Sequence, residues 1–251
     1  MGSYGLGFTL NEGVVVEASR AKRNEIVFNG ISIRFPAVLS AINKLTKEKV
    51  RVYIKSRLPL GCGFGLSGAS ALAASYAVND LLKLNKKNKE LGITAHTADA
   101  ENKTGLGDVV NQFYGGFCLK LKPSSSFEII SVPLNNIDVY CKYHSKISTK
   151  SIITDIKIRD KLNNAADESL KKIESSIKNK NLNFRDIIKI SKEFSTNSGL
   201  LKDKQTMETI KNIEKNNGNA SMIMLGNAVF SDKPFEGALK FRVSDKGAHL
   251  I

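Results

Sequence analysis

The sequence has no tryptophan and only three cysteines and three histidines among 251 residues. Cys62, Cys118 and Cys141 lie far apart, and this spacing fits neither a disulfide framework nor a zinc-binding motif. The histidines are equally dispersed. Scattered free thiols are typical of a reducing compartment, so we expect a cytoplasmic protein.

Long apolar runs are also missing. No run approaches the roughly 20 residues that a membrane-spanning helix needs. The first residues, MGSYGLGFTLNEG, lack the order of a secretory signal, in which basic residues precede an apolar core. We therefore expect no membrane partner. The hydrophobic content of 41% and the charged content of 25% are those of an ordinary globular protein with a sizeable core.

Acidic residues are scarce relative to basic ones, with 24 Asp and Glu against 38 Lys and Arg and a net charge of +14. Such an excess permits binding of nucleic acid or of anionic small molecules. Aromatic residues do not alternate with the lysines, as a base-stacking surface requires. The lysines gather in Lys/Asn-rich segments such as 83–90 and 178–185, which are typical of solvated helix ends and loops. We therefore expect no nucleic-acid partner.

The hydrophobic pattern favours strands in the first half of the chain and helices in the second, and so an α+β fold. It predicts strands over residues 8–17, 49–59, 115–122, 127–132 and 137–143. It also predicts a hairpin over 25–35 that turns at Asn29-Gly30. Helices are predicted over 36–45, 69–82 and 91–102, and in three segments after residue 156. Residues 221–231 fit a strand or a helix start, and Lys146–Lys150 is a candidate linker.

One segment, LPLGCGFGLSGA at residues 58–69, is rich in glycine and contains G-x-G-x-x-G. A dinucleotide-binding fold needs a second strand that ends in an acidic residue about 20 positions later, and the sequence that follows does not supply one. A Walker loop needs G-K-S/T after its glycines, which is missing too. A purely structural turn remains an alternative to a phosphate-binding loop.

A loop without Cβ atoms lets backbone N–H groups approach phosphate oxygens, and a helix start adds positive partial charge. Ser67 stands where the predicted helix begins. Its hydroxyl is therefore a candidate either to cap the helix or to coordinate Mg²⁺.

The segment from Pro59 to Ala69 resembles the phosphate-binding motif of the GHMP kinases, P-x-x-x-G-L-G-S-S-A. In that family the loop wraps the phosphates of ATP. The resemblance implies that ATP is bound by Pro59, Gly61, Gly63, Gly65, Ser67 and Gly68. It also implies that Ser67 ligates Mg²⁺, because it occupies the position of the second serine. Leu66 replaces the first serine.

A second segment, residues 95–122, resembles the same family. Six residues separate Asp108 from the pair Gly115-Gly116, and this spacing marks the catalytic aspartate of GHMP kinases, which orients or deprotonates the acceptor hydroxyl. The pattern A-H-x-A-D followed by G-L-G-D-V resembles the archaeal pantoate kinases of this superfamily, as does SMIMLG at 221–226. The resemblance therefore extends over nearly the whole chain.

This resemblance implies a two-domain GHMP kinase fold. Residues 1–134 would form a domain like domain 2 of ribosomal protein S5, and residues 135–251 a helix-rich α+β domain. The implied reaction is ATP-dependent phosphorylation of pantoate to 4-phosphopantoate in the archaeal route to coenzyme A, with Mg²⁺ as cofactor and a homodimer as the assembly. Family members carry a further strand ahead of the segment that begins here at Gly2, so we expect that strand to be lacking.

Pantoate carries a carboxylate and two hydroxyls, and the resemblance implies that Ser3, His96 and Lys120 bind it. Lys120 stands where an arginine is expected. Asp99 stands at the position of the metal-binding carboxylate, which is usually a glutamate. Glu101 competes for this role, but on a helix it lies about 200° from Asp99. Because Asp99 shares a face with His96, three positions earlier, we favour Asp99.

Three alternatives remain at this stage. The chain fits a GHMP kinase for another small alcohol, such as mevalonate, homoserine or shikimate. It also fits an RNA-binding protein with the S5-like fold, because of its positive charge. The replacements at Leu66 and Asp99, with the expected lack of the first strand, fit a homologue without activity.

Overall fold

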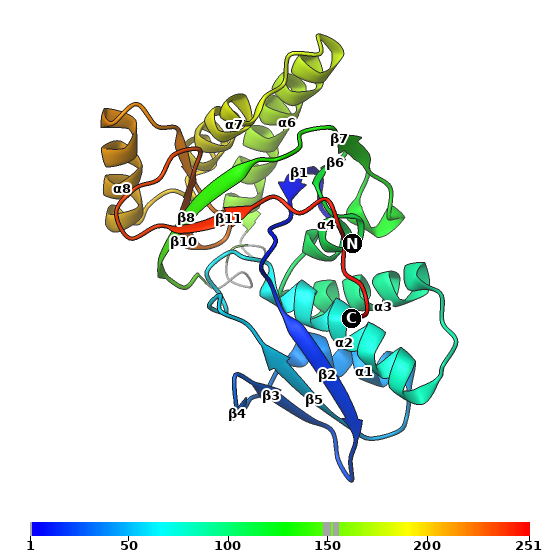
Figure 1. The fold of residues 1–251 in the computed structure, drawn as a ribbon. Coiled ribbons are helices and arrows are strands. Elements are labelled where there is room, and N and C mark those ends of the chain that lie inside the picture. Colours follow the sequence, from blue (N-terminus) through cyan, green and yellow to red (C-terminus); the bar gives the residue numbers. More distant parts are fainter. Residues whose placement is uncertain (1, 148–151, 153–155) are drawn as a thin grey trace. The chain divides into compact units, whose positions relative to one another are not determined.

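The computed structural model describes residues 2–147, 152 and 156–251 (Figure 1). The last three residues of the candidate linker Lys146–Lys150 lie outside the described residues. Contacts group the chain into two compact units, and each is described by itself. Unit 1 contains Met1–Pro59, Gly65–Val132 and Ser244–Ile251, and unit 2 contains Leu60–Phe64 and Pro133–Val243. The predicted domains 1–134 and 135–251 differ from these units in three places, Leu60–Phe64, residues 133–134 and Ser244–Ile251.

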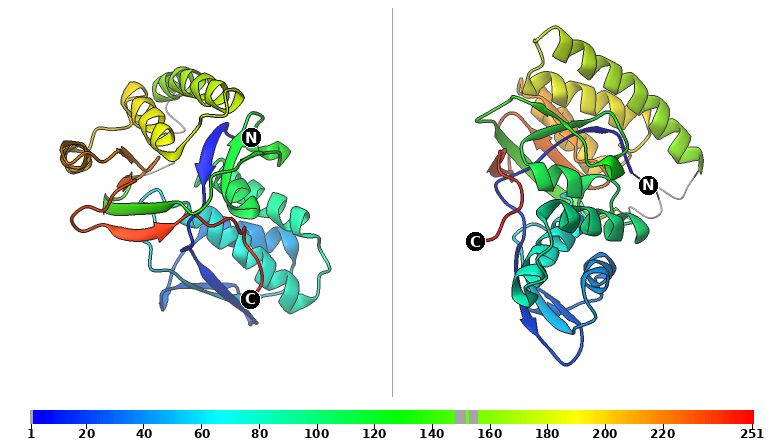
Figure 2. Two further views of the ribbon diagram at one scale, coloured as in Figure 1. Left: turned by 45° about the horizontal axis from the view of Figure 1, so that its top comes forward. Right: turned by 90° about the vertical axis from the view of Figure 1, so that its right-hand side faces the viewer.

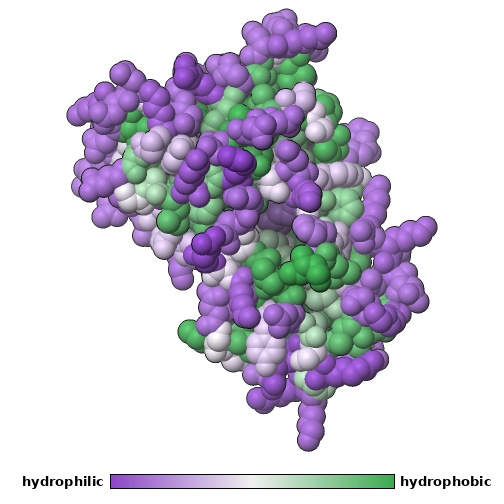
Figure 3. All heavy atoms as spheres, viewed as in Figure 1, coloured by the Kyte–Doolittle hydropathy of each residue, from purple (hydrophilic) through white to green (hydrophobic). Residues whose placement is uncertain are grey.

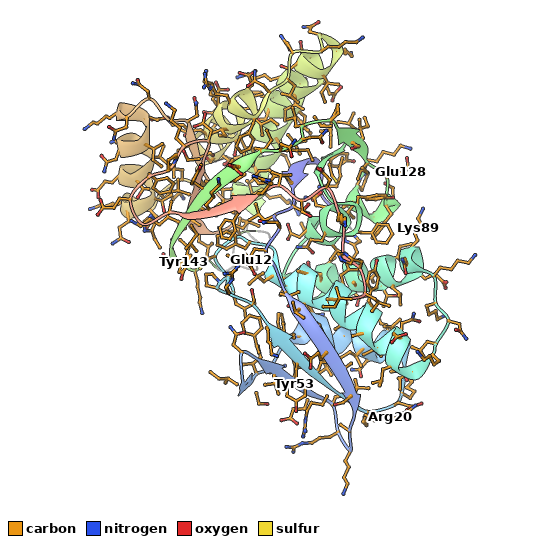
Figure 4. All side chains as sticks on the ribbon, viewed as in Figure 1. Glu12, Arg20, Tyr53, Lys89, Glu128 and Tyr143 are labelled. Atoms are coloured by element: carbon orange, nitrogen blue, oxygen red, sulfur yellow. The ribbon has the colours of Figure 1, made fainter. Side chains whose placement is uncertain are left out.

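Unit 1 contains a four-stranded sheet made of β2 (Val15–Arg20), β3 (Glu25–Phe28), β4 (Ile31–Ser32) and β5 (Val50–Lys55). The strand order is β2-β5-β3-β4, with β5 antiparallel to β2 and parallel to β3. The sequence of β5, VRVYIK, alternates between buried and exposed residues. Its apolar side chains therefore face the core, whereas Tyr53 lies on the outer face (Figure 4).

Three helices pack together in unit 1: α1 (Pro36–Leu45), α2 (Leu66–Leu82) and α3 (Asn88–Glu101). They form a layer against the four-stranded sheet, with α2 in contact with β2 and β5 (Figure 2). Small residues let these helices approach closely, and the buried cluster consists of Ala37, Ala41, Ala71, Leu72, Tyr76, Leu91, Ala95, Ala98, Val109, Val110 and Phe127. The short helix α4 (Asp108–Tyr114) packs against α2 and α3.

A second, three-stranded sheet of unit 1 has the antiparallel order β1-β6-β7, formed by Gly5–Phe8, Phe117–Lys120 and Ile130–Val132. The C-terminal segment Ser244–Ile251 lies beside this sheet. The N–H of Gly116 and the hydroxyl of Thr9 both donate to the carbonyl of Ser244, at 2.6 and 2.8 Å. Residues from both ends of the chain thus belong to one unit.

Unit 2 contains an antiparallel sheet of order β11-β8-β10-β9, formed by Leu239–Arg242, Asp138–Ser145, Asn227–Ser231 and Ala220–Met222. Its helices are α6 (Ile156–Lys178), α7 (Phe184–Asn197) and α8 (Lys204–Lys215). α7 packs against β9, and α8 packs against β9 and β10. Hydrophilic side chains cover most of the face of this unit that Figure 3 shows.

The structure confirms the α+β fold and most of the predicted elements. In the hairpin of β3 and β4, Asn29 and Gly30 both have positive φ, 49° and 84°. The single strand expected over residues 8–17 is wrong. β1 ends at Phe8, β2 begins at Val15, and the two strands belong to different sheets because polar residues between them turn the chain. Residues 221–231 form most of a hairpin, β9 and β10.

Neither α4 nor β11 was predicted, and neither was the short 3-10 helix Ser124–Ser126. The helix expected over residues 69–82 begins three residues earlier, at Leu66. No helix within the described residues combines the length and the apolar character needed to cross a bilayer.

Candidate active site

The glycine-rich loop takes a backbone path that side chains oppose. Gly61, Gly63 and Gly65 have φ angles of 82°, 89° and 64°. A residue with a Cβ atom is strained in this left-handed region, whereas glycine is not. The density of glycines in the loop is therefore explained by its conformation. Pro59 precedes the loop as the last residue of its segment in unit 1.

The first half of the loop belongs to unit 2, where it packs against the turn between β9 and β10. A Cβ atom on Gly63 would lie 3.0 Å from the carbonyl oxygen of Met224, and one on Gly226 would collide with the carbonyl of Cys62. The N–H of Ile147 also donates to the carbonyl of Gly61 at 3.0 Å. The glycine that ends the SMIMLG segment is thus required by a close approach of two backbones.

The second half of the loop belongs to unit 1 and begins α2. Gly65 is the N-cap residue, and no side chain caps the helix. Ser67 is the second helical residue, so of the two roles considered for its hydroxyl, capping of the helix is wrong. Its Oγ is buried and has no hydrogen-bond partner among the residues that the structure describes. The first N–H groups of α2 stay available for an anion, which the helix dipole also favours.

A buried carboxylate, that of Asp99 on α3, lies beside this helix start. It is 1% exposed, and Thr104 Oγ1 donates to its Oδ1 at 2.5 Å. Burial raises the pKa of Asp99, while the hydroxyls of Thr104 and Ser67 lower it. The Ser67 hydroxyl is therefore a neighbour of the carboxylate, although its geometry falls short of a hydrogen bond. Glu101 lies elsewhere, exposed and paired with Lys44 Nζ at 2.8 Å.

Asp108 is the first residue of α4 and faces the same space as Asp99. A Cβ atom on Gly105 would collide with Asp99 Oδ2 and lie 2.7 Å from Asp108 Oδ2. Burial, followed by the charge of Asp99, raises the pKa of Asp108 to about 6, although Lys120 and His96 lower it. A carboxylate with a pKa this close to neutrality is suited to accept a proton.

Lys120, at the end of β6, supplies a buried positive charge next to Asp108. The residue is 3% exposed, and its Nζ donates to Asn111 Oδ1 at 2.5 Å. Burial lowers the pKa of Lys120, while the charge of Asp108 raises it. Ser3 is close by, because a Cβ atom on Gly107 would collide with Ser3 Oγ and lie 3.4 Å from Lys120 Cε. An ammonium and a hydroxyl thus converge on the loop before α4.

His96 is buried on α3, three residues before Asp99 and one turn away on the same face. Its ring packs against the edge of Phe127, with the ring centroids 6.1 Å apart. Its charge also lowers the pKa of Asp108. The structure therefore places His96, Asp99, Asp108, Lys120 and Ser3 around one region of unit 1. Ser67 and Gly68 also belong to this unit.

Several polar residues of this region were not identified from the sequence. Ser124 Oγ accepts the N–H of Ser3 at 2.8 Å and donates to the carbonyl of Leu106. Gln112 Nε2 donates to the carbonyl of Gly65 at 2.8 Å. Asn111 and Gln112 follow Asp108 by three and four positions, the spacing of neighbours on one helix face. This signal was missed because α4 itself was not predicted.

The donor set fits a magnesium ion held jointly with nucleotide phosphates. Within the described part of the chain, no three side chains of His, Cys, Asp or Glu are grouped to hold a metal ion. Mg²⁺ is ordinarily held by one or two carboxylates together with phosphate oxygens. Asp99 and Asp108 supply carboxylates with raised pKa values, and the buried Ser67 Oγ lacks a partner. A cation bound by Ser67 and Asp99 would satisfy both of these groups.

Comparisons with known proteins agree with this arrangement. Residues 35–116 match the model of the GHMP kinases N terminal domain. A homoserine kinase from Sulfurisphaera tokodaii is 37% identical over 36% of this chain and 29% of its own length. A solved structure described as a phosphotransferase related to the CoA biosynthesis pathway superposes with a TM-score of 0.80. The superposition covers 98% of this chain and 88% of the other at 22% identity, so it shows that the fold is shared.

A curated pantoate kinase from Methanocaldococcus jannaschii is similar along most of its length. It is 32% identical over 91% of this chain and 83% of the relative. The matched region includes both segments that form the site, and the fold agrees with that of a GHMP kinase. This chain belongs to the pantoate kinase family of the GHMP kinases.

Proposed function

We propose that the protein transfers the γ-phosphoryl group of ATP to the 4-hydroxyl of pantoate. One observation carries the proposal: Asp108 lies close enough to the buried ammonium of Lys120 to feel its charge, and both lie near the start of α2. The pKa of Asp108 is raised to about 6. This arrangement joins a proton acceptor, a site for an organic anion and a site for phosphates. Family membership identifies pantoate as the anion.

The phosphates of ATP bind at the glycine-rich loop and the first turn of α2. Gly61, Gly63 and Gly65 adopt the left-handed conformation of this loop without strain. Gly68 has no side chain, so Asp99 Oδ2 lies only 3.3 Å from where a Cβ atom on Gly68 would be. Mg²⁺, held by Ser67 and Asp99, supplies positive charge to the phosphates when it is bound. Asp108 stays in reach of the same region because Gly65 has no side chain.

The pantoate carboxylate pairs with Lys120, and Ser3 and His96 contribute hydrogen bonds to the acceptor. A buried ammonium makes a strong ion pair with a carboxylate because little water competes for either charge. This contact fixes one end of the acceptor and presents its 4-hydroxyl to Asp108. Orientation of this kind supplies a large share of the rate in phosphoryl transfer.

In the reaction, the bond between the γ-phosphorus and the bridging oxygen of ATP breaks, and a bond forms between that phosphorus and the 4-oxygen of pantoate. The hydroxyl proton passes to the carboxylate of Asp108. The products are ADP and 4-phosphopantoate, an intermediate of the archaeal route to coenzyme A. A cytoplasmic location and a homodimeric assembly complete the proposal.

The proposal is tested by measuring ADP release with Mg-ATP and either pantoate, mevalonate, homoserine, shikimate or no acceptor. Pantoate should stimulate turnover by the wild type. Asp108→Ala should lose activity by about 100-fold or more, as expected for removal of a general base. Stimulation by another acceptor in place of pantoate would refute the substrate. If no acceptor stimulates turnover and RNA binds with a steep dependence on salt, the kinase assignment is wrong.

A further inference from the structure

Gln112, on α4, is held in one orientation by the glycine-rich loop. Its Nε2 donates to the carbonyl oxygen of Gly65 at 2.8 Å. A carbonyl oxygen only accepts hydrogen bonds, so the side-chain nitrogen must face it and the side-chain oxygen must point away. That oxygen lies by the first turn of α2, where a Cβ atom on Gly68 would be 3.1 Å from Gln112 Oε1 and 3.3 Å from Asp99 Oδ2.

The Oε1 atom of Gln112 is buried and has no hydrogen-bond partner within the described part of the chain. A buried amide oxygen without a partner destabilises the fold, because it has given up its hydrogen bond to water and gained none in return. Ser67 Oγ, on the same helix turn, shares this condition. Two unsatisfied oxygens therefore adjoin the buried carboxylate of Asp99, whose own pKa is raised. A bound group that brings protons or positive charge would satisfy both oxygens.

The chemistry of these atoms restricts what that group is. Gln112 Oε1 is an acceptor, and a phosphate oxygen is an acceptor too, so the two repel each other. A water molecule bound to a cation is a strong donor and suits an amide oxygen. Mg²⁺ usually retains several such waters. Ser67 Oγ and the carboxylate of Asp99 are suited to ligate the same cation.

We propose that Gln112 is a positioning residue that connects the glycine-rich loop to the magnesium site. Its Nε2 holds the carbonyl of Gly65, and its Oε1 accepts a hydrogen bond from a water bound to the metal. The inference rests on the proposed function, because it needs a metal-nucleotide complex at this loop. Gln112 lies four residues after Asp108, so the link also fixes α4 and its carboxylate.

The test compares Gln112→Met, which keeps the length and loses both hydrogen bonds, with Gln205→Met as a matched control. Gln205 is the chain's other glutamine and is exposed on α8. The dissociation constant of a non-hydrolysable ATP analogue is measured by calorimetry with Mg²⁺ and with EDTA. Binding of Mn²⁺ in the presence of the analogue is followed by electron paramagnetic resonance.

Gln112→Met should weaken binding of the metal-nucleotide complex by about 10- to 100-fold, as removal of an outer partner of a metal site does. Binding of the metal-free analogue should weaken less, and Gln205→Met should match the wild type. Gln112→Glu keeps an acceptor oxygen and should retain more Mn²⁺ affinity than Gln112→Met. It also serves as the test variant if Gln112→Met does not fold, as judged by circular dichroism.

Equal affinities of the wild type and Gln112→Met for the metal-nucleotide complex would overturn the inference. An equal loss with Mg²⁺ and with EDTA would also overturn it, because Gln112 would then support the loop alone. If the wild type itself does not bind the analogue under either condition, the proposed function fails. That result is distinguishable because it does not depend on the variants.

Discussion

At the scale of single residues, the site places charged groups where water is scarce. Asp99 and Lys120 are nearly inaccessible, and Asp108 is partly so. Burial raises the pKa of both carboxyl groups and lowers the pKa of the lysine, while the opposite charges of Asp108 and Lys120 restrain these shifts. The balance leaves Asp108 with a pKa of about 6, at which a proton is readily taken and released.

Activity should therefore depend on the ionisation of Asp108. The carboxylate accepts a proton only when it is ionised, so kcat/KM for pantoate should rise tenfold per pH unit below about 6 and level off above that value. A steady-state profile between about pH 5 and 9 checks this, with buffers of constant ionic strength. Asp108→Asn should lose both the activity and the rise of kcat/KM with pH. If Asp108→Asn keeps residual activity that still rises with pH below about 6, the rise belongs to another group.

At the scale of elements, the short helix α4 presents polar side chains to both sides of the site. Asp108 begins the helix, Asn111 reaches Lys120 on β6, and Gln112 reaches Gly65 before α2. β1 confines Asn111, because a Cβ atom on Gly7 would collide with Asn111 Nδ2. Helix and strand together thus set the position of the Lys120 ammonium, which we propose to bind the acceptor.

Gly7→Ala should displace Asn111 and with it the ammonium of Lys120. KM for pantoate should therefore rise by about 10-fold or more, because roughly one charge-assisted hydrogen bond is disturbed. The affinity for the ATP analogue should change little. Gly13→Ala is the matched control, because its Cβ atom would meet nothing within 4 Å. Steady-state kinetics with pantoate as the varied substrate decide the matter. An unchanged KM in a folded Gly7→Ala protein would contradict this account of the contact.

At the scale of the whole molecule, the chain returns to unit 1 at its C-terminal segment, Ser244–Ile251. The N–H of Ala248 donates to the carbonyl of Gln112 at 2.7 Å, on the helix that carries Asp108. Gly247 approaches α4 so closely that a Cβ atom on it would collide with the carbonyl of Phe113. Segments that are far apart in the sequence therefore fix the helix that carries Asp108.

Gly247→Ala should reduce the stability of unit 1, because the added methyl group meets a backbone carbonyl that cannot move without α4. Overpacking of this kind costs about 1–3 kcal/mol. For a chain of this length, that corresponds to a fall in Tm of about 2–4 °C per kcal/mol. Differential scanning calorimetry measures the change, with Gly13→Ala as the control again. Equal Tm values for the two variants would show that the contact is not tight.

The local parts of the site were predictable from the sequence, and the long-range parts were not. The glycine-rich loop and the segment around Asp108 carry short motifs, so the sequence alone makes Ser67, Asp99 and Asp108 candidate site residues. The helix of seven residues, DVVNQFY, is too short for a hydrophobic period to reveal, and with it Asn111 and Gln112 were missed. The return of the C-terminal segment depends on pairing across more than 100 residues, which leaves no local pattern.

The choice of acceptor is the central claim, and one competition experiment tests it most directly. The wild-type protein is incubated with Mg-ATP and equal amounts of pantoate, mevalonate and homoserine, and the phosphorylated products are identified by mass spectrometry and phosphorus NMR. The account predicts 4-phosphopantoate as the phosphorylated product, with the phosphorus coupled to the protons of the 4-carbon. Phosphomevalonate or phosphohomoserine as the main product, or ADP formed without any phosphorylated acceptor, would contradict it.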